Sequence, residues 1–212
     1  MFEANELRRI IGAAEAPLQA MILLGVNCGY GNADCGTLPL AALDLDGAWV
    51  NYHRPKTGIT RRCPLWPETV KALRESIAAR PKPKNSADAV LTFITSKGGS
   101  WHKKIEDNPI SKEMRKLLDS VALNGHRNFY ALRHTFETIG GEAKDQVAVD
   151  HIMGHARDDM ASVYRERISD ARLKAVTDHV RQWLFGVRTP ISTVSTSSNP
   201  VITDESPSAS SV

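Results

Sequence analysis

The fold is decided between residues 130 and 164, which read YALRHTF (130–136), GGEAKDQVAVDHIMGH (140–155) and ARDDMASVY (156–164). Apolar spacing and glycine breaks predict successive short helical segments in this stretch. These segments carry Arg133, a Gly154–His155 helix end and, nine residues after the histidine, Tyr164. A site built from these side chains would hold a fixed positive charge, a titratable donor and a phenolic nucleophile. This combination suits attack on a phosphodiester without a metal ion.

Outside that stretch, the sequence predicts further helices and a few short strands. Alternating aromatic and β-branched residues predict a hairpin of AWVNYHR (48–54) and ITRRCPL (59–65), which turns at Thr57–Gly58. AVLTFIT (89–95) predicts a third strand. The expected fold class is therefore α+β, with mostly helices around a small three-stranded antiparallel sheet. Apolar spacing places the helices at 3–14, 17–29, 67–79, 110–123, 130–139, 146–153 and 170–185.

The C-terminal part of the chain changes character after the last predicted helix. That helix has an apolar stripe that suits packing on the chain's own core or, equally, on a neighbouring protomer. Beyond it the sequence is rich in Ser, Thr and Pro and too polar to offset the entropy of ordering. We therefore expect one domain over residues 1–186 and a disordered tail over residues 187–212. The stripe consists of Leu173, Val176, Val180 and Leu184.

The composition is that of an ordinary globular protein, with 42% hydrophobic and 24% charged residues. The formal net charge of +3 is compatible with a nucleic-acid partner but does not require one. Cys28, Cys35 and Cys63 form no CxxC pair, which is typical of reduced thiols in a cytoplasmic protein. The longest apolar run is too short to span a bilayer, so we expect a soluble, cytoplasmic protein without a membrane role.

The Leu-Arg-His-Thr sequence at 132–135, the Gly-His pair and the later tyrosine together resemble the catalytic domain of the tyrosine recombinases, the phage integrase family. The similarity covers about residues 3–186 and includes the Pro-Lys-Thr hairpin at 55–57. It implies site-specific DNA recombination or DNA integration, as carried out by mobile genetic elements. The strands would be cleaved and rejoined through a 3′-phosphotyrosine intermediate.

The resemblance also implies which partners to expect. Double-stranded DNA would be the substrate, bound by a homo-oligomer, with no metal, no nucleotide cofactor and no small-molecule substrate. The family usually adds an N-terminal DNA-clamping domain that has no counterpart here, so we expect the catalytic half alone. A zinc site at His151 and His155 is disfavoured, because Gly154 breaks the helix between them and no acid follows His151.

The resemblance assigns roles residue by residue. Tyr164 would attack the scissile phosphate, Arg133 and His155 would hold its charge, and Lys56 would protonate the leaving 5′ oxygen. Each also has a structural alternative: a hydrogen-bonded helix tyrosine, a surface ion pair, a helix-end histidine and a solvated turn lysine. The hairpin residues expected to contact DNA backbone phosphates are Arg54, Arg61 and Arg62.

Two positions depart from the family pattern. Gly31 falls where the family places its first catalytic arginine, three residues before Asp34, and Tyr130 falls where it places a histidine. Loss of one preorganised donor costs about 3–4 kcal/mol, or roughly 10²–10³ in rate. The alternative to an active recombinase is therefore a catalytically impaired relative that acts as a DNA-binding or regulatory module, or a remnant of a mobile element. The cations near enough in sequence to compensate are Arg54, Arg61, Arg62 and Arg127.

Overall fold

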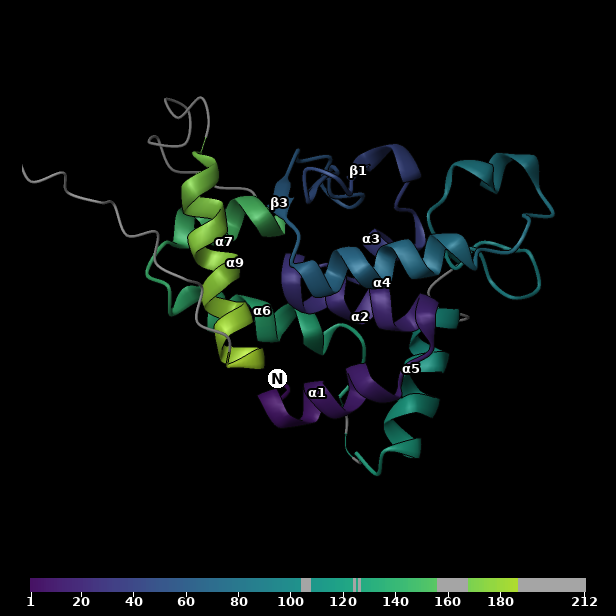
Figure 1. Ribbon diagram of the computed structural model, residues 1–212, viewed down its shortest axis with the longest axis horizontal. Helices are drawn as coiled ribbons and strands as arrows, with labels where there is room; N and C mark the ends of the chain where they lie inside the picture. Colours follow the sequence, from purple (N-terminus) through teal and green to yellow (C-terminus); the bar gives the residue numbers. More distant parts are fainter. Residues whose placement is uncertain (104–107, 124, 126, 156–167, 187–212) are drawn as a thin grey trace, which may run out of the picture.

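The computed structural model describes residues 1–103, 108–123, 125, 127–155 and 168–186. Within these ranges the chain forms a mostly helical body with a small sheet at one side (Figure 1). The elements in chain order are α1 (Ala4–Ala13), α2 (Ala16–Cys28), α3 (Asn32–Gly36), the 3-10 turn η1 (Leu40–Ala42), β1 (Leu43–Asp44), β2 (Trp49–Asn51), β3 (Arg62–Pro64), α4 (Pro67–Ala78), the 3-10 turn η2 (Ser86–Val90), α5 (Pro109–Ser120), α6 (Ala131–Gly141), α7 (Gln146–Met153) and α9 (Asp170–Phe185).

Helix α2 is the centre of the core, as its uniformly apolar sequence predicts. All residues from Ala20 to Cys28 are buried, and α1, α4, α5, α6 and α9 pack around the helix (Figure 1). Gly25 lets α6 approach closely, because a Cβ at this position would lie 2.8 Å from Leu132 Cδ1. The helix ends at Gly29, whose φ of 64° is the left-handed conformation that favours glycine.

A buried amide joins α2 to the sheet and to α4. The Asn27 Nδ2 donates to the Pro64 carbonyl at 3.0 Å. Its Oδ1 accepts from the Trp66 backbone N–H at 2.9 Å and from the Thr69 hydroxyl at 3.0 Å. Because every polar atom of this side chain has a partner, its burial is not penalised, and it fixes the position of the sheet on the helical core.

The predicted hairpin is confirmed, but the third strand lies elsewhere. β1, β2 and β3 form an antiparallel sheet in that order, with Leu43 opposite Val50 and Val50 opposite Cys63. The prediction of a strand at 89–95 is wrong: the segment starts in η2 and then makes only isolated bridges at Leu91 and Ile94 among the described residues. Phe93 and Ile94 of this segment are buried without a strand to pair with, so packing overrides their β-propensity, whereas Val90 is exposed.

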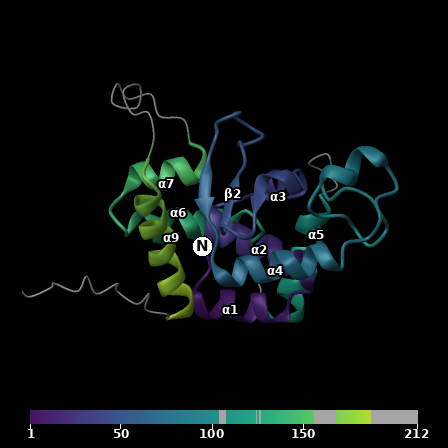
Figure 2. The same cartoon turned by 45° about the horizontal axis from the view of Figure 1, so that its top comes forward.

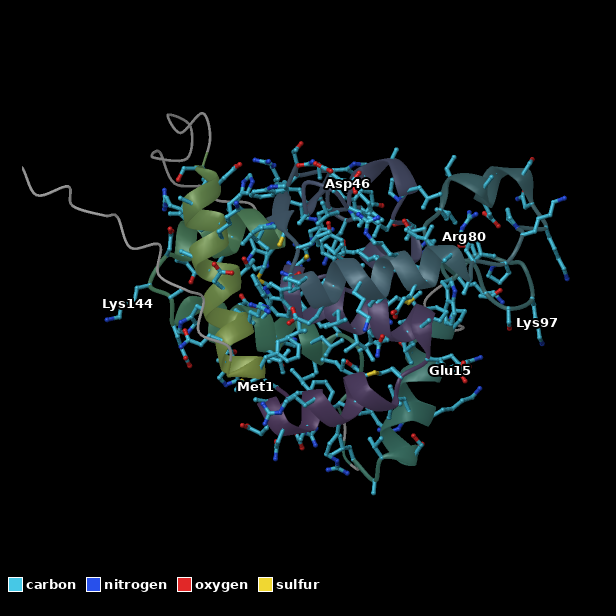
Figure 3. The ribbon with its side chains drawn as sticks, in the orientation of Figure 1. Met1, Glu15, Asp46, Arg80, Lys97 and Lys144 are labelled. Atoms are coloured by element: carbon cyan, nitrogen blue, oxygen red, sulfur yellow. The ribbon has the colours of Figure 1, made fainter. Side chains whose placement is uncertain are left out.

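Helix α9 packs on the chain's own core rather than presenting its apolar stripe to solvent. The four stripe residues are at most 1% exposed, and the helix contacts α1, α2, α6, α7 and β3. Lys97 and Lys144 lie at the periphery, at opposite ends of the molecule (Figure 3). The three cysteines are buried and free, as predicted. Within the described ranges, no helix is both long and apolar enough to cross a membrane.

Candidate active site

Arg133 lies at the junction of α2, α6 and α7 and is 2% exposed. Its Nη1 donates to the Gly29 carbonyl at 2.5 Å, and its Nη2 donates to the Met153 carbonyl at 2.8 Å. Burial lowers the pKa of the Arg133 guanidinium, and the neighbouring Arg54 lowers it further, but arginine remains protonated at any useful pH. Both carbonyl acceptors are neutral, so these contacts orient the cation without cancelling its charge.

His155 completes the surroundings of this guanidinium. Its Nε2 lies 2.9 Å from Arg133 Nη2. A guanidinium can only donate, so Nε2 must accept and the ring proton must be on Nδ1, which lies 3.4 Å from Asp150 Oδ1. Gly154, with a φ of 65°, ends α7 and turns His155 back towards Arg133. The structure therefore brings together the arginine and the histidine that the sequence assigned to one site.

The β2–β3 hairpin lies against the same turn. Figure 2 shows it projecting between α3 and α7. Arg54 Nη1 and Thr57 Oγ1 both lie 3.4 Å from the Gly154 carbonyl oxygen. Lys56 lies between these two residues in the turn and is exposed. The hairpin thus holds the Lys56 loop beside the Gly154–His155 turn, with the ammonium group facing solvent.

Arg61 is a buried side chain rather than a surface cation. It is 1% exposed, its Nη2 contacts Asp34 Oδ1 at 2.5 Å, and its Nε donates to the Tyr52 carbonyl at 3.0 Å. The guanidinium carbon lies 4.1 Å from the centre of the Tyr30 ring. A carboxylate as buried as Asp34 requires a paired cation, which explains why the side chain turns inward. Arg61 therefore lies inside the hairpin, and its predicted contact with a DNA phosphate stays a prediction.

Arg62, next in the chain, has a different environment. Its guanidinium stacks on the Trp49 ring at 3.7 Å and forms an ion pair with Asp170. The side chain is 39% exposed. It joins β3 to the start of α9 and remains accessible, so its predicted role at a DNA phosphate stays a prediction.

The two positions that depart from the family pattern are neighbours. Gly31 caps α3, and its N–H donates to Asp34 Oδ2 at 2.6 Å. A Cβ at Gly31 would lie 3.4 Å from Tyr130 Cδ2. Tyr130 is 42% exposed, and its ring packs edge-on against His134 with 5.0 Å between the centroids. Position 31 therefore lies beside Asp34 and Tyr130, and no side chain extends from it.

The sequence profile of the phage integrase family matches residues 1–170. The chain belongs to the phage integrase family. XerA recombinase is similar to it in structure, with a TM-score of 0.63 and 20% identity over 85% of this chain and 64% of that one. The integrase from mycobacterium phage Brujita has a TM-score of 0.60 and 20% identity over 90% of this chain and 60% of that one.

A third similar structure is a lambda integrase dimer bound to a COC′ core site, with a TM-score of 0.57 and 17% identity, over 80% of this chain and 49% of that one. The chain thus spans between 49% and 64% of the length of these three proteins. No curated protein matches its sequence significantly. The family match and the shared fold confirm the predicted family and the predicted α+β class.

One residue at the site of this phage integrase family member was not predicted from the sequence, and some predicted residues lie outside the part of the chain that the structure describes. Asp150, which faces the Nδ1 of His155, was not singled out, although an acid five residues before the histidine lies one helical turn away. Tyr164 and the predicted cap at Asp158–Asp159 lie outside the described residues. Among the residues that are described, no group of three or more His, Cys, Asp or Glu side chains is arranged to hold a metal ion.

Proposed function

We propose that this phage integrase family member cleaves and rejoins DNA in site-specific recombination or integration. The observation that carries the proposal is the contact between Arg133 Nη2 and His155 Nε2 at 2.9 Å. The two side chains come from different helices, α6 and the end of α7, and meet beside the hairpin that carries Lys56. A fixed cation, an imidazole and a nearby ammonium are the groups that a phosphoryl transfer without a metal requires.

The proposed reaction assigns one step to each group. The Tyr164 oxygen attacks the scissile phosphorus and forms a bond to the 3′ phosphate, and its proton passes to His155 Nε2. The bond from phosphorus to the 5′ oxygen breaks, and Lys56 gives that oxygen a proton. Arg133 holds one phosphate oxygen, whose charge increases in the transition state, and His155, once protonated on Nε2, donates to another. Attack by a 5′-hydroxyl reverses these steps and rejoins the strand.

The contacts of Arg133 favour this role. Its acceptors are two carbonyl oxygens and a neutral imidazole, so a phosphate oxygen would replace a neutral acceptor with a charged one. Hydrogen bonds between a guanidinium and an anion are stronger than those to neutral groups. The carbonyls of Gly29 and Met153 meanwhile hold the guanidinium in place, so little reorganisation is needed when DNA binds.

The partner that we propose is double-stranded DNA, bound by more than one copy of the chain. The lambda integrase structure shows a dimer on a core site. In this chain, Arg54 and Lys56 on the projecting hairpin and Arg62 beside it are accessible cations that would contact backbone phosphates. Residues 1–186 would form the domain that binds and cleaves. A cytoplasmic location also remains a prediction.

Gly31 favours a second candidate function, in which the domain binds DNA without cleaving it. The position lies beside Asp34 but carries no charge, and the adjacent Tyr130 supplies a hydroxyl in place of an imidazole. A loss of about 10²–10³ in rate per missing donor would leave a binding or regulatory module. Such a protein would show salt-dependent binding to duplex DNA and no covalent intermediate.

Relaxation of supercoiled plasmid, with covalent protein–DNA complexes trapped by detergent, separates the two functions. No target site is needed, because one cleavage and religation suffices. We expect relaxation and trapping by the unchanged chain and neither by Tyr164→Phe. Tyr52→Phe is the matched control, because it removes the same hydroxyl from a tyrosine whose OH bonds to Thr37. Binding without trapping by the unchanged chain would overturn the proposal and favour the binding module.

A further inference from the structure

We propose that Arg61 supplies the second guanidinium of the phosphate site, in place of the charge that Gly31 does not carry. The inference rests on the proposed function, because it assigns a phosphate-binding residue to the same reaction. The sequence offers Arg61 as one of four cations that could compensate and does not distinguish it from the other three. Three features of its surroundings support it: its acid partner, its neighbour Gly154 and its unpaired nitrogen.

The first feature is that Asp34 joins Arg61 directly to position 31. One carboxylate oxygen of Asp34 accepts from the Gly31 N–H at 2.6 Å, and the other contacts Arg61 Nη2 at 2.5 Å. A side chain on Gly31 would begin 3.4 Å from the first of these oxygens. An arginine at position 31 would therefore compete for the carboxylate that Arg61 already uses. Arg61 reaches that place from the residue before β3 instead of from the N-cap of α3.

The second feature is that Arg61 packs on the turn that carries His155. A Cβ on Gly154 would lie 3.3 Å from Arg61 Cδ and 3.0 Å from Arg54 Cβ. The carbonyl of the preceding residue, Met153, accepts a hydrogen bond from Arg133. Arg61 thus lies between position 31 and the Gly154–His155 turn, and Arg133 contacts the same turn through the Met153 carbonyl and His155. The two arginines therefore share this turn as a neighbour.

The third feature is a donor of Arg61 without a partner. Its Nε and Nη2 are engaged by Tyr52 and Asp34, but Nη1 is buried and has no hydrogen-bond partner within the described part of the chain. In an arginine, Nη1 lies on the same edge as Cδ, and Cδ is the atom next to Gly154. Buried guanidinium nitrogens are seldom left unpaired. A phosphate oxygen in the site would satisfy it.

The other cations considered from the sequence are tied elsewhere. Arg62 is paired with Asp170 on the outside of β3, and Arg127 is paired with Glu6 on α1. Arg54 is nearer, but its Nη1 lies against the Gly154 carbonyl on the hairpin side. Of the four, Arg61 is the one that contacts Asp34, whose carboxylate also accepts from the Gly31 N–H.

The test measures the initial rate of covalent complex formation on supercoiled plasmid, together with DNA affinity and the melting temperature. We expect Arg61→Gln to lower that rate by about 10²-fold or more, with affinity changed only a few-fold. Adding Gly31→Arg to Arg61→Gln should raise the rate of covalent complex formation at least tenfold above that of Arg61→Gln. The backbone at position 31 is extended, and its contacts leave room for a Cβ. Arg181→Gln, which breaks an arginine–carboxylate pair remote from the site, is the control for loss of an ion pair.

Gly31→Arg alone keeps the test decisive if Arg61→Gln does not fold. Where Arg61 already supplies the charge, an added arginine should give no gain in rate. A tenfold gain would overturn the inference, as would a folded Arg61→Gln that forms the complex at the unchanged rate. If the unchanged chain forms no complex, the proposed function fails and the inference with it. If it does, these variants test the inference alone.

Discussion

Arg133 and Arg61 are both buried arginines of one site, yet their surroundings differ. Arg133 is held by two backbone carbonyls and a neutral imidazole. Arg61 is held by a carboxylate and the face of the Tyr30 ring. The charge of Arg133 is therefore available to an anion from outside, whereas that of Arg61 is largely matched by Asp34. The difference indicates that Arg133 is arranged mainly for a ligand and Arg61 mainly for the fold. The Nη1 of Arg61 nevertheless has no hydrogen-bond partner among the described residues.

The largest expected effect comes from breaking the ion pair on the Arg61 side. Asp34→Asn keeps the shape but leaves a buried guanidinium without an acid, which should lower the free energy of unfolding by about 3–5 kcal/mol. Urea denaturation measures this change in the free energy of unfolding. Asp46→Asn is the matched control, because Asp46 is paired with Arg74 but is 96% exposed, and should change little. Equal effects of the two variants would contradict a structural role for the buried pair.

Substitution of Arg133 should change the rate of covalent complex formation more than the stability of the fold. Arg133→Gln should slow covalent complex formation by about 10²–10³-fold, because the substrate phosphate loses its cation. Arg133→Lys should be nearly as slow, since an ammonium cannot span the Gly29 and Met153 carbonyls and also reach the substrate. The rate of detergent-trapped complex is the measurement. A Lys variant at the unchanged rate would show that the fork geometry is unimportant.

A smaller effect tests the close packing of α2 on α6, which positions Arg133. The substitution leaves Arg61 unchanged. In Gly25→Ala, the added Cβ would lie 2.9 Å from Leu132 Cβ, so α6 must shift. We expect a loss of about 1–3 kcal/mol in unfolding free energy, measured in urea. Gly12→Ala in α1, which has nothing within 4 Å, should instead add about 0.5–1 kcal/mol. Similar changes in both variants would contradict the close approach of α2 and α6.

The smallest effect concerns Arg62, the cation next to Arg61, and its influence on the pKa of His151. Burial lowers the pKa of His151, and Arg62 lowers it further. Below pH 6.5 the unfolded chain therefore binds a proton that the folded chain does not, and stability falls as the pH falls from there towards the folded pKa. NMR titration should show the His151 pKa rising in Arg62→Gln. An unchanged pKa would mean that Arg62 does not act on α7.

The sequence predicts the elements that depend on local patterns. The uniformly apolar stretch of α2 and the helix stop at the glycine after Met153 are visible in the sequence, and both are confirmed. The strand expected at 89–95 is wrong, because β-branched residues such as Ile94 also occur where a loop packs into the protein interior. Local propensity does not distinguish these two environments.

The site is predictable in part. Arg133 and His155 follow from the family pattern, and the structure brings them together. The inward turn of Arg61 does not follow, because it depends on a carboxylate 27 residues earlier in the chain. Surface arginines and buried ones have the same sequence signature in a hairpin. Only the burial of Asp34, a tertiary property, makes the difference.

The most direct test of the central claim is mass spectrometry of the peptide that stays attached to DNA after detergent trapping and nuclease digestion. The proposed mechanism predicts a nucleotide joined through its 3′ phosphate to Tyr164. The Tyr164→Phe chain should give no such peptide, and Arg133→Gln should give far less of it. An adduct on Tyr130, which also faces the site, or no adduct from a chain that binds DNA, would contradict the account.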